Sequence, residues 1–205
     1  LPSFDALMDI YGFDSAIKAA IYPEIMFIET AVKNIVLARI LENIEDPGLA
    51  TFLKRGLRTC RDVNGRVVNG QMGEKLKLKS QLQNIVRRSY KNDLVKHYVD
   101  RDDDAPVWSI FEVMTLGDLT SVCRSLPDEI LADIASDLGL LHANPGIVIN
   151  IVETIRPLRN AVAHNGAVFD SRFSQSVKYP KTDRNLAAVG ELLDEDLSIG
   201  YRLNF

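Results

Sequence analysis

The chain carries at residues 146–164 the stretch GIVINIVETIRPLRNAVAH, in which apolar and polar residues repeat with the period of an α-helix. Arg156, Arg159, Asn160 and His164 lie close together on one part of this predicted helix, because residues three and four apart are helix neighbours. The stretch therefore predicts a helix that buries an apolar face and presents a polar cluster. The apolar face consists of Ile147, Ile151, Ile155, Leu158 and Val162.

Helical periodicity dominates the rest of the chain, so the sequence predicts an all-α fold. One helix is expected over Asp14–Asn43, where Pro23 should kink or divide it, and another over Glu74–Val99. The dipeptides Asn64-Gly65 and Asn69-Gly70 predict turns around a loop or a short hairpin. The remaining predicted helices cover residues 106–116, 119–124, 127–138 and 186–193, with Gly117 interrupting between the first two.

Composition places the chain among single-domain globular proteins. With 205 residues, of which 46% are hydrophobic, it can build a core without disulfides or a structural metal. Cys60 and Cys123 lack metal-ligand spacing, so we interpret them as reduced thiols of a cytoplasmic protein. We find no apolar run long enough to span a bilayer and no secretory signal, and Leu1 in place of Met leaves an upstream segment open.

Charge is distributed unevenly along the chain. The net charge is −4, yet residues 54–101 hold 13 Lys and Arg against 4 Asp and Glu, a local charge of +9. This asymmetry fits a polyanion-binding face, and it fits a solvated lysine-rich helical arm equally well. We expect a helical core from residues 14–46 and 105–193, with residues 49–104 as a basic insertion.

Arg159, Asn160 and His164 form a set suited to cleaving RNA. A histidine moves protons near neutral pH, and an arginine binds phosphate with two hydrogen bonds and stabilises developing negative charge. Asparagine can orient the imidazole or a phosphate oxygen. RNA supplies its own nucleophile, the 2′-hydroxyl, so no metal or cofactor is required. The alternative for such a spacing is a surface or helix-capping pair.

Three blocks of sequence raise the nuclease interpretation above that alternative. The segment Ile28–Ile35, the segment Pro106–Gly117, and the block Arg156–Asn165 occur in the order found in the abortive-infection (Abi-like) branch of the HEPN superfamily. The sequence resembles that branch from about Ile25 to Asn165. The resemblance implies a HEPN-like helical bundle in which Arg159 and His164 are the catalytic pair and Asn160 the polar residue that follows the arginine.

The resemblance also implies how the site works. In the superfamily two such motifs face each other across a dimer, so a homodimeric, metal-independent endoribonuclease of phage defence or toxin type is expected. The alternative is a non-catalytic protein that holds a structured non-coding RNA. The chain departs from the branch at Asn165-Gly166, where a second histidine is common.

Further residues complete the predicted site. Glu29 and Glu112 lie on apolar helices and either orient Arg159 or His164 or form structural ion pairs, which we favour. Trp108 is interpreted as a core anchor. The candidate RNA-binding residues are Lys75, Lys77, Lys79, Arg87, Arg88, Lys91 and Arg156.

Overall fold

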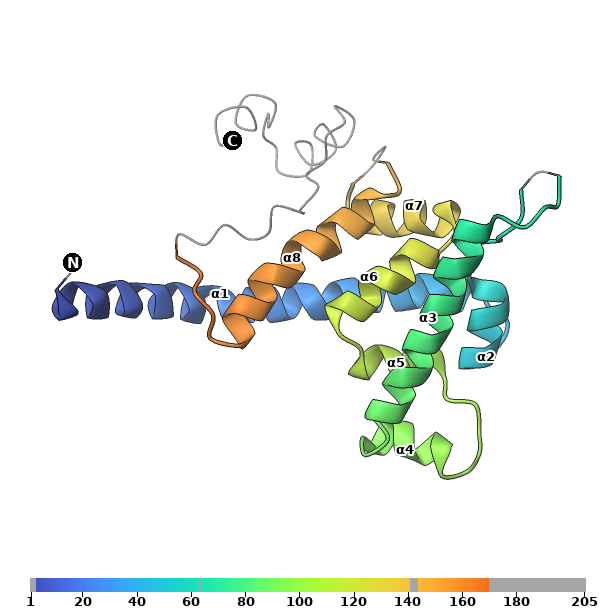
Figure 1. Cartoon of the computed structure of the whole chain (residues 1–205), viewed down its shortest axis with the longest axis horizontal. Helices are drawn as coiled ribbons and strands as arrows, with labels where there is room; N and C mark the ends of the chain where they lie inside the picture. The colour runs from blue at the N-terminus through green and yellow to red at the C-terminus, as the bar shows by residue number, and fades with distance from the viewer. Residues whose placement is uncertain (1–2, 63, 141–143, 170–205) are drawn as a thin grey trace.

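The computed structural model describes residues 3–62, 64–140 and 144–169, and the helix predicted at 186–193 lies outside them. Regular structure in these ranges is entirely helical, which confirms the all-α prediction. Figure 1 shows the helices gathered around the C-terminal half of the first one. They are α1 (Phe4–Glu42), α2 (Leu49–Thr51), the π-helix η1 (Phe52–Gly56), α3 (Asn69–Arg88), α4 (Asp93–Val99), α5 (Val107–Val113), α6 (Leu116–Ser125), α7 (Asp128–Asp137) and α8 (Ile147–Ala163).

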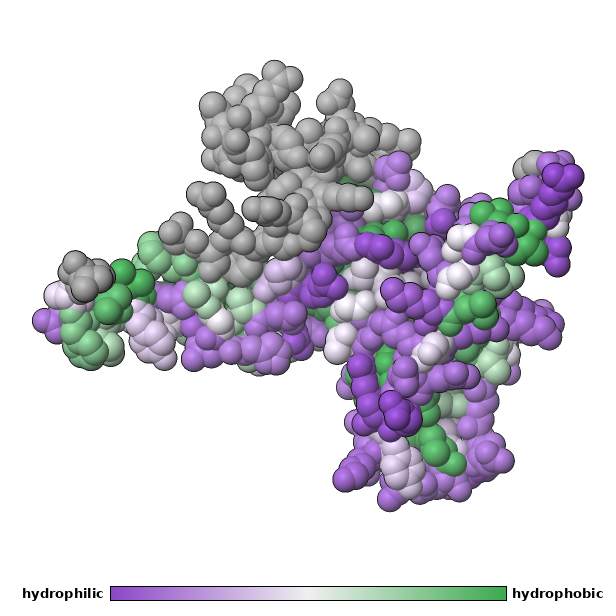
Figure 2. Space-filling model, in the orientation of Figure 1, coloured by the Kyte–Doolittle hydropathy of each residue, from purple (hydrophilic) through white to green (hydrophobic). Residues whose placement is uncertain are grey.

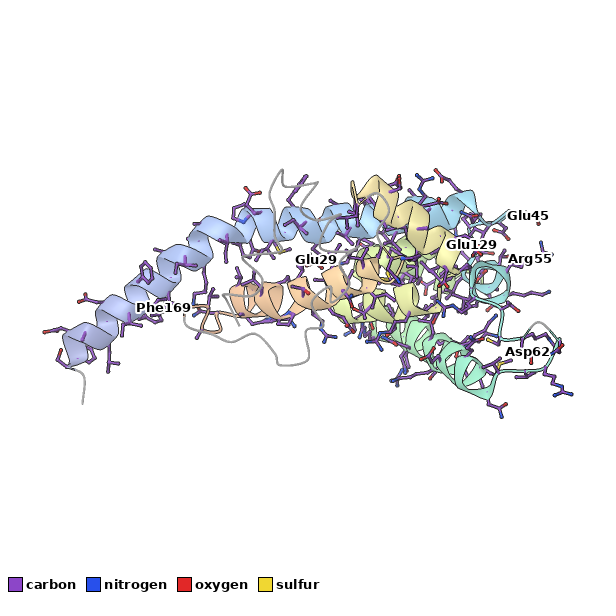
Figure 3. The ribbon with its side chains drawn as sticks, turned by 90° about the horizontal axis from the view of Figure 1, so that it is seen from above. Glu29, Glu45, Arg55, Asp62, Glu129 and Phe169 are labelled. Carbon is purple, nitrogen blue, oxygen red and sulfur yellow. The ribbon has the colours of Figure 1, made fainter. Side chains whose placement is uncertain are left out.

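Helix α1 is 39 residues long and begins ten residues before its predicted start. Ser3 caps it, because the Ser3 hydroxyl accepts a hydrogen bond from the Ala6 N–H at 3.2 Å. Pro23 lies inside the helix and does not divide it, although the helix axis curves along its length (Figure 3). The N-terminal half of α1 projects beyond the other helices as an arm, which we call the α1 arm and define as residues 4–22 (Figure 1).

One hydrophobic core holds the molecule together, and α8 lies within it. Ile147, Val148 and Val152 are buried, whereas Ile151 and Ile155 are only partly buried against the same core. The buried face of α8 is therefore offset from the predicted one, because α8 packs against both α1 and α6 and is covered from two sides. The polar cluster on the last turns of α8 remains at the surface.

The basic segment adds to this core. Leu78, Leu82 and Ile85 of α3 are buried in the same hydrophobic cluster as the core residues of α1 and α6. The single helix predicted over residues 74–99 is wrong, because the chain breaks between α3 and α4. There the Asn92 side chain caps α4 by accepting from the Leu94 N–H at 3.0 Å.

Two predicted turns have different outcomes. Gly65 has a φ of +77° and turns a loop closed by a bridge between Arg61 and Val67, as the hairpin prediction requires. Asn69 and Gly70, predicted as a second turn, instead form the first turn of α3. Helix α3 has Val68 as its N-cap and begins without a side-chain cap, so no capping residue marks its start in the sequence.

The junction between α5 and α6 differs from its prediction in two ways. The break falls at Met114 and Thr115, and Gly117 lies inside α6, because Thr115 and Asp118 form a reciprocal capping box at the start of that helix. Trp108 is not a core anchor: it is 36% exposed and packs edge-on against Tyr98, with ring centroids 6.0 Å apart.

The structure also bears on the cysteines and on membrane insertion. Cys60 and Cys123 are buried free thiols, as predicted. Among the helices in the described ranges, none is both long enough and apolar enough to cross a membrane.

Candidate functional site

Arg159 is held in place by a buried carboxylate from a distant helix. Its Nε donates to Oε2 of Glu29 on α1 at 2.6 Å, and the other oxygen of Glu29 accepts from Lys33 Nζ at 3.0 Å. The Glu29 side chain is only 6% exposed, and Figure 3 shows it in the space between α1 and α8. One carboxylate thus orients two cations, one of which is the predicted catalytic arginine.

The charges of this cluster explain why Glu29 stays ionised. Burial alone would raise the pKa of Glu29, but hydrogen bonds from Lys33 and Arg159 outweigh it and hold that pKa below its ordinary value. Lys33 also donates to the backbone carbonyl of Met114 at 2.7 Å, which ties α1 to the α5–α6 junction. The cluster carries one net positive charge and connects three helical elements. Glu29 therefore combines the ion pairing we favoured with the orienting role that was the alternative.

Asn160 contacts the arginine and not the imidazole. Its Oδ1 accepts from Nη1 of Arg159 at 3.5 Å, the upper limit for a hydrogen bond. Within the described part of the chain, Nη2 of Arg159 has no hydrogen-bond partner, so that edge of the guanidinium is available to an anion. The expected contact between Asn160 and His164 exists only in the backbone, where the His164 N–H donates to the Asn160 carbonyl at 3.0 Å.

His164 occupies the C-cap of α8, and the chain reverses immediately after it. Gly166 N–H donates to the carbonyl of Ala161 at 2.7 Å, the long-range bond of a Schellman cap, and Asn165 adopts a φ of +55°. Asparagine is among the residues that adopt this left-handed conformation more readily than most. The His164 side chain is exposed, and no described residue hydrogen-bonds its ring.

The segment after His164 is fastened to the α1 arm, which sequence reasoning missed. Lys18 Nζ donates to the Asn165 side chain at 2.6 Å and pairs with Asp14 at 2.9 Å. Asp14 in turn accepts from the backbone N–H groups of Val168 and Phe169. The only signal in the sequence is an Asp and a Lys four residues apart on a helix. We call this set of contacts the clasp.

The contacts of the clasp lower the pKa of one of its members, Asp14. The backbone N–H of Phe169, the Lys18 ammonium and the backbone N–H of Val168 together lower the pKa of Asp14 to about 2. The rings of Phe13 and Phe169 add an edge-to-face contact with centroids 5.2 Å apart. The exit from the His164 turn is therefore fixed by charge and by packing together.

A cavity of about 430 Å³ lies beside the Glu29–Arg159 pair, between α1, α5 and α8. Glu112 lines this cavity and makes no ion pair with a described residue, so the predicted pairing of Glu112 is absent in the part of the chain that the structure describes. Across the described ranges, no group of three or more His, Cys, Asp or Glu is arranged to hold a metal ion.

The seven candidate RNA-binding residues do not form one surface. Lys75 and Lys79 line a cavity of about 450 Å³ together with Lys54, Arg55 and Arg61. We call this the basic cavity and define it by those five cations; none of its described lining residues is a carboxylate. Figure 3 places Arg55 and Asp62 at the end of the molecule opposite Phe169. The basic cavity is therefore remote from the turn that carries His164.

The other candidates are dispersed over α3, α8 and the loop before α4. Lys77 and Arg156 line a separate cavity of about 280 Å³ between α3, α6 and α8. Arg87 and Lys91 are exposed. Arg88 pairs with buried Asp118, where hydrogen bonds from Gln81, Thr115 and Arg88 outweigh burial and lower the pKa of Asp118. Arg88 thus has a structural partner, and Arg156 is the candidate nearest to Arg159 in sequence.

These features define an all-helical protein in which a buried glutamate of another helix orients Arg159, while the C-cap of α8 positions His164. Comparison with known proteins places the chain more closely. The sequence model of the Abi-like protein family matches residues 2–170, so the chain belongs to that family and is an Abi-like abortive-infection protein. No curated protein and no solved structure matches the chain.

Proposed function

We propose that this protein is a metal-independent endoribonuclease of phage defence. The observation that carries the proposal is the ion pair from Glu29 to Arg159, which fixes the guanidinium beside the turn of His164 and leaves one edge free. A guanidinium held this way can bind a phosphate and stabilise the charge that develops on it. Membership of the Abi-like family supports the defence role.

The chemistry follows from what RNA supplies. The 2′-oxygen attacks the adjacent phosphorus, the bond from phosphorus to the 5′-oxygen breaks, and a 2′,3′-cyclic phosphate and a 5′-hydroxyl result. The proton of the 2′-hydroxyl leaves to one imidazole, and the departing 5′-oxygen takes a proton from another. Arg159 stabilises the charge on the non-bridging phosphate oxygens. Two imidazoles serve this scheme better than one.

A homodimer would supply the second imidazole. The α1 arm exposes large apolar side chains, and Figure 2 shows hydrophobic surface toward its N-terminal end. Such side chains are typical of association surfaces. Because the clasp joins this arm to the segment after His164, a partner packed on the arm would lie next to the candidate site. The most exposed of these residues are Phe4, Leu7, Met8, Tyr11 and Phe13.

The decisive test is cleavage of single-stranded RNA by the wild type and by His164→Ala. We expect cleavage in the presence of EDTA, products with cyclic phosphate ends, and a loss of at least a hundredfold in His164→Ala, since general acid–base catalysis contributes about 10²–10⁴-fold. His97→Ala is the matched control, because His97 is exposed on α4 and its ring interacts, among the described residues, with Arg101 and Tyr98. Undiminished cleavage by His164→Ala with an intact fold would refute the assignment.

The basic cavity favours a second candidate function, the holding of a structured RNA without cleavage. Its five cations line one cavity, and the lining residues that the structure describes include no carboxylate. Such a surface binds phosphates through charge, and its affinity falls steeply with salt. RNA that copurifies intact with the wild type and is released by salt would support this function over the nuclease.

A further inference from the structure

The cavity beside Arg159 is built from all three blocks of sequence on which the family resemblance rests. Glu29 and Asn34 come from the first block, Trp108 and Glu112 from the second, and Arg159 from the third. These segments are far apart in the sequence and meet only through the packing of α1, α5 and α8. Together they enclose one hollow beside the ion pair. We call this hollow the Trp108 cavity.

The Trp108 cavity offers one aromatic surface and several apolar walls. Trp108 is 36% exposed, and its ring is held edge-on by Tyr98, so the indole is fixed in orientation yet partly open. Aromatic rings of this kind stack on nucleobases, which are flat, apolar on their faces and polar along their edges. The apolar lining comes from Met26, Leu37, Phe111, Val113 and Met114.

Two polar side chains in the cavity have unused hydrogen-bonding capacity. Lys33 is already engaged by Glu29 and by the Met114 carbonyl. Asn34 and Glu112, by contrast, make no hydrogen bond or ion pair through their side chains within the described residues. An ionised Glu112 only accepts hydrogen bonds, whereas the Asn34 amide both donates and accepts.

We propose that the Trp108 cavity is a nucleobase-binding subsite, which places one base of the RNA on Trp108 while Arg159 holds the adjacent phosphate. The proposal rests on the proposed function, and it adds a preference. An acceptor such as Glu112 matches the exocyclic amino group of adenine, cytosine or guanine. Uracil has carbonyls on both sides of its one N–H and would bring an acceptor against Glu112.

The test uses nucleoside 5′-monophosphates, which contain no bond that the proposed nuclease can cut. Trp108 is the only tryptophan in the chain, so fluorescence excited at a wavelength that spares the tyrosines reports on this cavity. We expect saturable quenching by AMP, GMP or CMP and an affinity for UMP at least several-fold lower. A free tryptophan derivative titrated in parallel corrects for absorption by the nucleotides. If none of the four nucleotides quenches the fluorescence saturably, the proposal is overturned.

Variants separate stacking from edge recognition. Calorimetry should show at least about tenfold weaker binding to Trp108→Leu but near-wild-type binding to Trp108→Phe, since base–aromatic stacking is lost only in the first. Glu112→Gln should reduce the discrimination against UMP, because the new amide can donate. Asp133→Asn on α7 is the matched control for that carboxylate-to-amide change, and it should leave all four affinities unchanged.

The outcomes also distinguish this proposal from the nuclease itself. Nucleotide binding without any RNA cleavage would leave the subsite standing and refute the nuclease. RNA cleavage with no nucleotide binding would refute the subsite and leave the nuclease standing. Thermal unfolding of each variant identifies any that fails to fold. If Trp108→Leu does not fold, the affinities of Trp108→Phe for the four nucleotides are compared with those of the wild type instead.

Discussion

Glu29 determines how Arg159 is presented to the surface. Its carboxylate has two cationic partners, and both lie on or near the wall of one cavity. The imidazole of His164, in contrast, has no described partner and takes its position from the backbone of its helix cap. Charge therefore fixes the position of Arg159, and main-chain geometry fixes the position of His164.

The first prediction concerns Glu29→Gln. The change leaves Lys33 and Arg159 without their shared counter-ion, and because both are partly exposed we expect a loss of only about 1–3 kcal/mol in unfolding free energy. RNA cleavage should fall by more than tenfold, because the guanidinium loses its orientation. Chemical denaturation and cleavage rates measure the two effects.

Glu42→Gln provides the control for that substitution. Glu42 lies on the same helix and pairs with Arg39 at the surface, where Arg39 keeps Asp137 as a second partner. An exposed pair of this kind contributes about 0–1 kcal/mol. Equal losses of stability and cleavage in the two variants would show that Glu29 has no special role.

The second prediction concerns the effect of Asp14→Asn on stability as the pH is lowered. The pKa of Asp14 is lowered from 3.8 to about 2 in the folded chain, so ionised Asp14 stabilises the fold above pH 3.8 and this contribution disappears as the pH falls through about 2. The variant should be less stable than the wild type at neutral pH, and the difference should vanish near pH 2. Urea unfolding across this range is the measurement, and Asp9→Asn, which changes an exposed carboxylate on the same helix, is the control and should leave stability at neutral pH nearly unchanged.

At the scale of helices, α3 is both a core element and the carrier of basic side chains. Its residues Leu78, Leu82 and Ile85 are buried, whereas Lys75 and Lys79 line the basic cavity on another face. This arrangement bears on the expectation that residues 49–104 form an insertion. A true insertion would tolerate changes on its apolar face, and a core element would not.

The third prediction therefore compares two leucines of α3. Leu82→Ala should destabilise the protein by about 2–5 kcal/mol, as large-to-small changes in a packed core do. Leu76→Ala on the same helix, where the side chain is 57% exposed, should cost less than about 1 kcal/mol. Denaturant unfolding measures both, and similar small values would favour an insertion that contributes little to the core.

The α1 arm gives the fourth prediction. Leu7 and Tyr11 lie one turn apart on its exposed surface, so Leu7→Glu with Tyr11→Glu would place two charges in an apolar dimer interface. We expect a dimer of the wild type in light scattering and a monomer of the double variant, with RNA cleavage lost. Leu94→Glu, an exposed apolar site on α4, is the control and should remain dimeric. A wild-type monomer that cleaves RNA would contradict the composite site.

Sequence reasoning predicted helices better than their ends and contacts. The periodicity of 146–164 and the helix signals at Pro106 and Pro127 gave α8, α5 and α7 within a few residues. The break before α4 depends on the Asn92 cap, and asparagine is common both in turns and at helix starts. The start of α3 has no side-chain cap, so no capping residue marks it in the sequence. The link from Glu29 to Arg159 joins residues 130 positions apart, and no local pattern contains it.

At the scale of the whole molecule, the basic cavity and the turn that carries His164 lie far apart. Arg55 lies at one end and Phe169, beside the His164 turn, at the other (Figure 3). An RNA that uses both regions must reach from the basic cavity to Arg159. Long RNA should therefore bind more tightly than short RNA, while the cleavage step itself depends on the site at Arg159.

The fifth prediction tests that separation. Lys75→Gln with Lys79→Gln should reduce the magnitude of the slope of log affinity against log salt for single-stranded RNA by about 1.4, because each of the two lost phosphate contacts removes roughly 0.7. Cleavage of a short oligonucleotide should change little. Filter binding over a salt series gives the slope, and an unaltered slope would show that the basic cavity does not contact RNA.

The clasp couples the ordering of the turn after His164 to self-association through the α1 arm. Whatever stiffens the α1 arm also stabilises the turn after His164, because Lys18 and Asp14 of the arm hydrogen-bond to Asn165 and Val168 of that segment. Thermodynamic linkage requires the effect to be reciprocal. If two copies meet along their arms, a ligand that orders the turn must tighten their association by the same factor by which association tightens ligand binding, and dilution becomes a means of switching the site off.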